Sequence, residues 1–261
     1  MKSDPLTIAA RRREPLPFAP IIDIHGHCGP GAPFPIFAET PDLFLQEMDR
    51  LGVSRLYASS YAGLNGWASH GNADALAFQQ AAPGRLFGYM TIDPLNSPAE
   101  VDNTLEQAYA TGLRMLKIHA SMGRKLPYSA PAYQQAFTWA DAHNVPVLAH
   151  TWGIELPDLE PLAKKHPGLI LILAHAGATQ PEEYIRLARS YPNIRLDTAF
   201  SQCQIGLLEF LVRGAGAEQI LWGSDANFMN MSHQIGQVIF ADISYEEKCA
   251  ILGGNAARII P

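Results

Sequence analysis

Short, nearly continuous apolar runs alternate with longer amphipathic segments along most of this chain. The run Leu169–Leu173 is apolar at every position, which is typical of a parallel strand that is buried on both faces. Eight such runs predict strands over Ile21–His25, Val53–Ser59, Leu86–Ile92, Leu113–His119, Val145–His150, Leu169–His175, Ile194–Ala199 and Ile220–Ser224.

The segments between these runs have the patterns of helices. Several carry a proline in the first turn, where the missing N–H costs nothing. Gly52, Gly112 and Gly168 stand just past predicted helix ends, where a left-handed backbone is common. The predicted helices cover Pro41–Leu51, Asn72–Ala82, Pro98–Thr111, Pro131–His143, Pro157–His166, Pro181–Ser190, Ile205–Gly214 and Tyr245–Ile259.

This alternation predicts an α/β protein with one (β/α)8 TIM-barrel domain over residues 20–261. An open doubly wound sheet is the alternative, but no G-x-G-x-x-G phosphate loop follows an early strand. Residues 1–19 are rich in Arg and Pro, and we expect them to form an N-terminal tail or strap.

Composition narrows the function classes. The 261 residues carry a net charge of −6, so the basic face that nucleic-acid binding needs is missing. The three cysteines form no CxxC pair, which argues against a disulfide framework and a thiolate zinc site. The chain shows neither a signal-peptide core nor an apolar run near the ~20 residues of a membrane span. We therefore expect a cytoplasmic protein that acts on a small molecule, without nucleic-acid or membrane partners.

Histidines gather at the ends of the predicted strands. In a barrel the carboxyl ends of all strands meet at one mouth, which is where active sites form. A carboxylate, Asp225, follows the last predicted strand and joins this group. The histidines that end or directly follow strands are His25, His27, His119, His150 and His175.

The spacing in the first strand favours a metal site. Because side chains alternate along a strand, Asp23, His25 and His27 should point the same way. Imidazole and carboxylate donors suit Zn²⁺, and also Mn²⁺ or Fe²⁺. A lone H-x-H pair is a weak signal, and His150 alone is more often a hydrogen-bonded core residue. The joint placement at several strand ends is what favours one divalent ion.

Lys117 and His119 share a face of the fourth predicted strand with Met115. A carbamylated Lys117 could bridge two metal ions. The same lysine could bind a substrate carboxylate or pair with Asp23 or Asp225, because a buried lysine is costly without a partner. We favour a charge role for Lys117 beside a single metal ion.

Together these motifs resemble the amidohydrolase superfamily, in its amidohydrolase-related branch of metal-dependent TIM-barrel hydrolases and decarboxylases. The resemblance spans about residues 20–260 and keeps the order of the landmarks. The matching motifs are Asp23–His27, Leu116–His119, Ala149–His150, Ala174–Gly177, Leu221–Asp225 and Gly254–Ile259.

The resemblance implies roles for individual residues. The side chains of His25, His27, His150 and Asp225 would bind one divalent ion, most often zinc. His175 would hold the metal-bound water and act as general acid or base together with Asp225. Lys117 stands in the pattern of mononuclear members of the branch, and such enzymes are often homo-oligomers.

From this site we predict a metal-dependent hydrolase that uses a metal-activated water on a small, carboxylate-bearing amide, ester or lactone. One alternative is a non-oxidative decarboxylase of an aromatic or unsaturated acid, and another is a non-catalytic barrel protein. Lys117, His119, Trp152 and Phe228 are predicted to bind substrate. Further loop candidates are Phe34, Trp67, Arg124, Lys125, Phe200 and Asn227.

Overall fold

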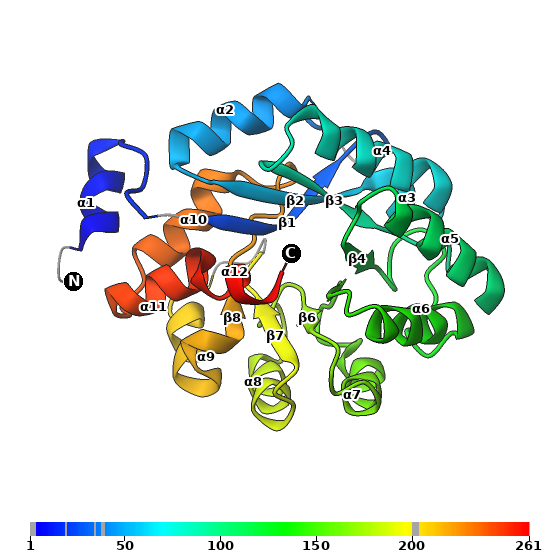
Figure 1. Cartoon of the computed structure of the whole chain (residues 1–261). Coiled ribbons are helices and arrows are strands. Elements are labelled where there is room, and N and C mark those ends of the chain that lie inside the picture. The colour runs from blue at the N-terminus through cyan, green and yellow to red at the C-terminus, as the bar shows by residue number, and fades with distance from the viewer. Residues whose placement is uncertain (1–3, 19, 34, 38–39, 200–203, 261) are drawn as a thin grey trace.

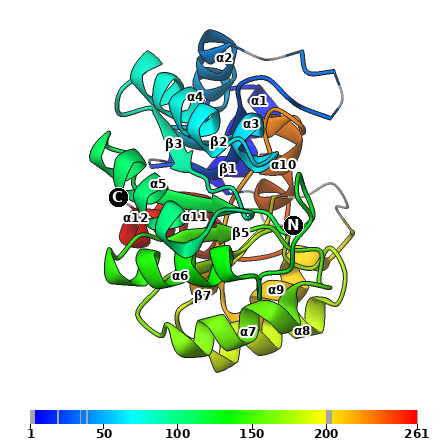
Figure 2. The ribbon, with the colours of Figure 1, turned by 90° about the vertical axis from the view of Figure 1, so that its right-hand side faces the viewer.

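Eight parallel strands pair in their order along the chain, and helices surround them (Figures 1 and 2). The computed structural model describes residues 4–18, 20–33, 35–37, 40–199 and 204–260. The predicted TIM barrel is confirmed. The strands are β1 (Ile22–Cys28), β2 (Arg55–Ser60), β3 (Leu86–Met90), β4 (Met115–Ile118), β5 (Val147–Ala149), β6 (Leu171–Leu173), β7 (Ile194–Asp197) and β8 (Ile220–Leu221).

Each predicted helix corresponds to helical structure at or near the expected place. The corresponding helices are α2 (Pro41–Leu51), α4 (Ala68–Ala81), α5 (Pro98–Ala110), α6 (Pro131–Ala142), α7 (Leu156–Lys165), α8 (Pro181–Ser190), α9 (Leu207–Ala215), α11 (Tyr245–Cys249) and α12 (Ala256–Ile259). The last two were expected as one helix. A π-helical turn, η2 (Ala250–Gly254), separates them, where Gly253 packs so closely on Pro20 that an added Cβ would lie 1.9 Å from its carbonyl oxygen.

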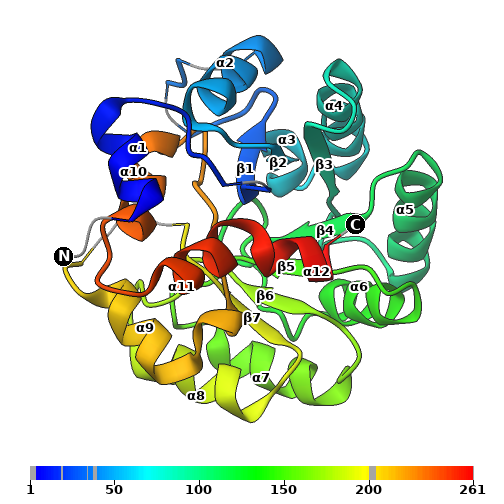
Figure 3. The same cartoon turned by 60° about the vertical axis from the view of Figure 1, so that its left-hand side comes forward.

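Four short elements were not predicted. They are α1 (Pro5–Arg12), α3 (Tyr61–Leu64), the 3-10 turn η1 (Ala217–Gln219) and α10 (Met231–Ile239). Helix α1 lies within the segment expected as a tail. Asp4 caps it, and its Leu6 is fully buried. Figure 3 shows α1 against α10, where the Thr7 hydroxyl donates to the carbonyl of Ile239.

Two apolar layers hold the barrel together. The larger layer lies between the strands and the surrounding helices. The smaller one fills the barrel interior below the mouth, and its members include Ile22, Ile24, Met115, Leu148 and Ile172. These interior residues show which face of each strand points inward. Among the described residues, no helix is both long and apolar enough to cross a membrane.

The barrel closes between β1 and the chain that follows β8. The N–H of Asp225 donates to the carbonyl of His25 at 2.7 Å, and Ile24 donates to Trp222 at 3.2 Å. Gly26 bridges to Ala226 at the same seam. The seam therefore places the start and the end of the barrel, with their candidate ligands, side by side.

Candidate metal centre

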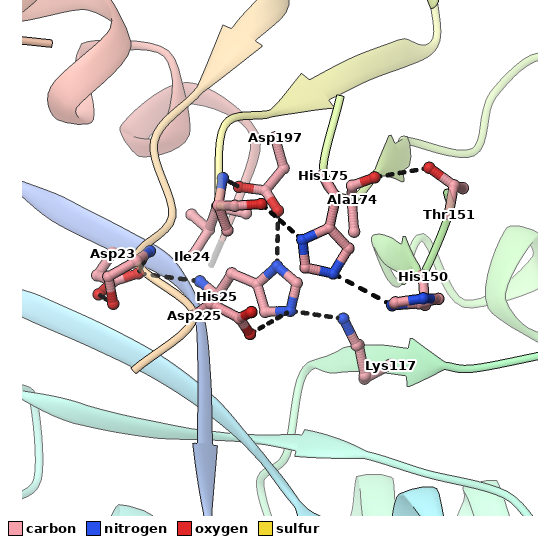
Figure 4. A network of polar contacts seen from close by, with 12 residues as sticks. Asp23, Ile24, His25, Lys117, His150, Thr151, Ala174, His175, Asp197 and Asp225 are labelled. Carbon is pink, nitrogen blue, oxygen red and sulfur yellow. Dashed lines mark hydrogen bonds and ion pairs between the residues drawn. The ribbon is translucent and has the colours of Figure 1, made fainter. Parts of the chain in front are cut away.

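The structure brings the predicted ligands together at the carboxyl ends of the strands. His25 and His27 lie in β1, His150 directly follows β5, and His175 comes two residues after β6. Asp225 follows β8. Figure 4 shows that His25, His175 and Asp225 converge from different strands, with His150 beside His175. All five side chains are buried.

A bulge in β1 sets the direction of the first two histidines. The pairing with β2 shifts register between Asp23 and Gly26, so one extra residue breaks the alternation. The expectation that Asp23 shares a face with both histidines was wrong for this reason. Its carboxylate instead accepts the backbone N–H groups of His25 at 3.1 Å and Ser224 at 2.9 Å.

Asp225 lies between the two histidines of β1. Its Oδ1 is 2.9 Å from Nε2 of His27 and 3.6 Å from Nε2 of His25. Donor atoms of His25, His175 and Asp225 all lie within 4.8 Å of one another. Two ligands of one tetrahedral zinc ion are about 3.3 Å apart. The spacing of these donors therefore fits a shared divalent ion.

The charge of Asp225 also suits a ligand. Burial by itself raises the pKa of this carboxyl, but the hydrogen bond from His27 and the nearby His25 outweigh burial and hold the pKa well below its usual range. Burial lowers the pKa of His25, so this imidazole stays neutral and can donate a lone pair. The centre combines one ionised carboxylate with neutral imidazoles, which is the donor set that zinc prefers.

His25 is fixed by a residue that the sequence did not reveal. Its Nδ1 lies 2.6 Å from Oδ2 of Asp197, the last residue of β7. Asp197 is fully buried, and burial raises its pKa to about 6. Because Nδ1 of His25 donates a hydrogen bond to Asp197, Nε2 of His25 presents its lone pair to the centre. The feature of the sequence that could have pointed to Asp197 was a carboxylate within a run that predicts a buried strand.

Lys117 lies on the other side of His25. Its Nζ is 2.8 Å from Nε2 of His25, and its side chain is 1% exposed. An ion pair with Asp23 or Asp225, one of the alternatives that the sequence left open for Lys117, does not form in the part of the chain that the structure describes. Burial lowers the pKa of Lys117 to about 8, although the charges of Asp225 and Asp197 oppose the shift. A metal ion bound to Nε2 of His25 would require the amine of Lys117 to move away from this nitrogen.

A second group of imidazoles continues the site. Nδ1 of His175 donates to the carbonyl of Ala199 at 2.6 Å, and its Nε2 lies 3.1 Å from Nδ1 of His150. His119 stacks on His150 with 3.6 Å between ring centroids. Nε2 of His150 and Nδ1 of His119 are buried without a hydrogen-bond partner among the described residues. A buried imidazole nitrogen without a hydrogen-bond partner is suited to bind a metal ion.

His175 and Asp225 both have a left-handed backbone, with φ of 57° and 60°. This conformation is uncommon for residues other than glycine, and where it occurs it is often found at functional sites. Ile172 in β6 and Ala174 directly after it face inward, so plain alternation would turn His175 outward. The left-handed turn at His175 is what directs its side chain into the mouth.

Aromatic side chains cover the centre. The ring of Trp152 stacks over His175 at 5.6 Å, and Phe228 lies 5.0 Å from the ring of His27. Tyr61 stacks on the same His27 at 5.2 Å, and its hydroxyl donates to Oδ1 of Asn227. The structure thus places all four predicted substrate-binding side chains next to the candidate ligands, namely Lys117, His119, Trp152 and Phe228.

Other loop candidates lie farther out. Trp67 and Arg124 line a separate cavity of about 1080 Å³, and Arg124 contacts Asp93 at 3.4 Å. Lys125 lines a further cavity near Ile154. Phe34 and Phe200 lie outside the described residues.

Comparison with known proteins agrees with this architecture. The 5-carboxyvanillate decarboxylase from Sphingomonas paucimobilis superimposes with a TM-score of 0.76 at 19% identity, covering 92% of this chain and 98% of the other. A dihydroxybenzoic acid decarboxylase from Polaromonas sp. JS666, with bound manganese, gives 0.73 at 17%, covering 92% and 96%. A probable 2-pyrone-4,6-dicarboxylic acid hydrolase from Acinetobacter baumannii gives 0.72 at 16%, covering 92% and 98%.

At these identities the likeness shows the fold. No curated protein sequence matches the chain. The family model described as amidohydrolase, however, matches residues 22–261, which include every strand of the barrel and every candidate ligand. The chain therefore belongs to the amidohydrolase family and is an enzyme of this metal-dependent group.

Proposed function

We propose that this enzyme is a hydrolase that cleaves an amide, ester or lactone bond in a small carboxylate-bearing molecule at a single divalent metal ion. The observation that carries the proposal is the buried group of His25, His175 and Asp225, whose donor atoms lie within 4.8 Å of one another at the barrel mouth. Hydrolysis needs a group that accepts a proton from water, and an ionised Asp225 is such a group.

The metal would be held by His25, His27, His150 and Asp225, and zinc suits these donors best. When bound, the ion would supply Lewis-acid chemistry, because it lowers the pKa of water and polarises a carbonyl group. Manganese is the alternative that the similar decarboxylase with bound manganese supports.

The side chains of this protein have separate tasks in the proposed reaction. Asp225 accepts the proton of the attacking water at a carboxylate oxygen. Nε2 of His175, which faces the same space, then takes this proton from Asp225 and delivers it to the leaving group. Lys117 provides a buried positive charge for the substrate carboxylate. Trp152 and Phe228 exclude bulk water, which strengthens each of these electrostatic interactions.

Decarboxylation is the second candidate. Several of the similar structures are decarboxylases of aromatic acids, and this likeness supports the second candidate at least as well as the first. In that reaction the carboxylate carbon leaves as CO₂, and Asp225 or His175 returns a proton to the ring carbon. The same residues thus serve both candidates, and only the products separate them.

The test is to assay zinc- and manganese-loaded protein with 5-carboxyvanillate, 2,6-dihydroxybenzoate and 2-pyrone-4,6-dicarboxylate, the compounds named for the similar enzymes. Trapped CO₂ reports decarboxylation, and uptake of water into the product reports hydrolysis. His25→Ala should lose turnover and metal, whereas His166→Ala, a buried histidine outside the centre, should keep both. Turnover that survives complete removal of metal would overturn both candidates.

A further inference from the structure

A groove of about 670 Å³ opens beside the candidate metal centre. Its walls come from α2 and from the loops that follow β1 and β8, the same two strands that supply three of the proposed ligands. The apolar side chains that line it are Ile36, Phe37, Leu43, Phe44, Phe228 and Met229. Its volume is in the range of small-molecule sites.

Phe228 belongs to both the groove and the centre. One side of its ring contacts His27 at 5.0 Å and Tyr61 at 5.0 Å, and the same residue forms part of the groove wall. Its neighbour Asn227 also lines the groove and accepts the hydroxyl hydrogen bond of Tyr61. The ring of Phe228 therefore borders both the groove and the candidate ligand His27.

The charges of the groove are already paired. Among its lining residues Arg50 and Glu47 carry charge, and they form a bidentate salt bridge. Nε of Arg50 lies 2.8 Å from Oε2 of Glu47, and Nη2 lies 2.6 Å from Oε1. A substrate carboxylate would have to break this pair to bind Arg50. The wall instead offers exposed apolar surface, with Phe37 95% exposed and Leu43 40% exposed. Such surface favours an uncharged, apolar occupant.

The proposed ligands are buried, none of them more than 9% exposed, so a substrate that reaches them extends outward from the centre into the surrounding loops. We infer that this groove binds the apolar substituent of the substrate while its reactive group lies at the centre. The substrate class is then a molecule with one carboxylate, a scissile amide, ester or lactone bond at the centre and an alkyl or aryl substituent in the groove, and not a dicarboxylate. This inference rests on the proposed function, and it adds the direction in which the substrate extends.

Binding of a series of inert acids tests the inference. We would titrate zinc-loaded full-length protein with benzoate, 4-propylbenzoate, 4-pentylbenzoate and isophthalate by calorimetry. The pentyl chain should tighten binding about tenfold or more over benzoate, because each buried methylene adds affinity. Isophthalate, with a second carboxylate, should bind no more tightly than benzoate.

Substitutions in the groove locate the effect. Leu43→Glu and Phe37→Glu place a charge in the groove at exposed positions and should abolish the gain from the pentyl chain, without changing the affinity for benzoate. Ile8→Glu is the matched control, since Ile8 is 39% exposed on α1, outside the groove, and it should keep the full gain.

Three outcomes overturn the inference: equal affinities across the series, a gain that persists in both groove variants, or groove variants that convert a dimer into monomers. In the last case the groove is an interface between two copies. Repeating the benzoate titration with metal-free protein shows whether binding requires zinc, and this result tests the proposed metal centre independently of chain length.

Discussion

Oδ2 of Asp197 lies 2.6 Å from Nδ1 of His25, and this contact joins the end of β7 to β1 across the barrel mouth. The other carboxylate oxygen accepts the N–H of Ala199 at 2.9 Å, so the carboxylate is held from both sides. A carboxylate that accepts a hydrogen bond from a ligand histidine fixes the orientation of the imidazole ring. It also raises the basicity of the other ring nitrogen. Asp197 thus prepares His25 to bind a metal ion.

Removing this carboxylate should weaken metal binding. We expect Asp197→Ala to raise the Kd for zinc about 10- to 100-fold, measured by competition with a chromophoric chelator. Asp141→Ala is the matched control, because Asp141 also contacts a histidine, His166 at 3.0 Å, but far from the centre. Equal zinc affinities in the two variants would show that Asp197 plays no part in holding the metal.

The sequence predicted the candidate ligands because each of them stands at the end of an apolar run. Asp197 lies within the predicted strand Ile194–Ala199, but its partner is 172 positions away, and nothing local marks a carboxylate that contacts a histidine. The direction of Asp23 was wrong because a bulge depends on the pairing of two strands. Backbone conformations such as the left-handed turn at His175 likewise follow from tertiary contacts.

The helices show the same division. Helix α5 begins with a capping box at Ser97 and Glu100, a local signal, and was predicted. Helix α1 is only eight residues long, which is too short for an isolated helix to be stable, so propensity alone does not specify it. It forms because Leu6 is buried and because Asp4 pairs with Lys248 on α11. Such docking cannot be read from the eight residues themselves.

Lys117 should remain an unmodified amine. We expect zinc reconstitution to give one equivalent of metal per chain, with or without bicarbonate, because His25, His175 and Asp225 form one compact group of candidate donors. Elemental analysis counts the metal, and native mass spectrometry would detect the added mass of one CO₂. Two equivalents of metal together with that added mass would establish a carbamylated lysine that bridges two ions.

The contact between Asp4 and Lys248 should make the attachment of α1 depend on pH. Burial alone raises the pKa of Asp4, but the hydrogen bond from Lys248, 2.7 Å away, outweighs burial, so the net pKa is lowered. Because the folded pKa lies below the unfolded value of about 3.9, the pair stabilises the fold above that pH. This stabilisation is lost as the pH falls through the lowered pKa.

Asp4→Asn isolates this charge, since asparagine also caps a helix well. Lys248 is 1% exposed, and leaving it unpaired should cost about 2–3 kcal/mol of unfolding free energy near neutral pH. The difference from wild type should shrink as urea titrations move below about pH 4. Glu160→Gln, which breaks an exposed pair with Arg186, should cost less than about 1 kcal/mol.

A side chain at position 26, at the seam of the barrel, should destabilise the fold. An added Cβ would lie 2.9 Å from Cδ1 of Leu56 and 3.0 Å from the carbonyl oxygen of Ala226, and that backbone cannot yield without opening the seam. We expect Gly26→Ala to lower the unfolding free energy by about 1–3 kcal/mol. Gly236→Ala, on α10 with open space around its Cβ position, should instead raise it by up to about 1 kcal/mol.

The two histidines that follow β5 and β6 should separate in a metal-binding experiment. Nε2 of His150 is buried without a hydrogen-bond partner among the described residues, whereas Nδ1 of His175 donates to Ala199. The predicted roles give the metal to His150 and proton transfer to His175, and the Nδ1 hydrogen bond of His175, like that of His25, would equally direct its Nε2 lone pair into the site. His150→Ala should lose most of its bound zinc, and His175→Ala should keep about one equivalent while its turnover falls about 100-fold or more. His175 is, however, one of the three residues whose donor atoms lie within 4.8 Å. Loss of zinc from His175→Ala, with zinc retained in His150→Ala, would exchange the two roles.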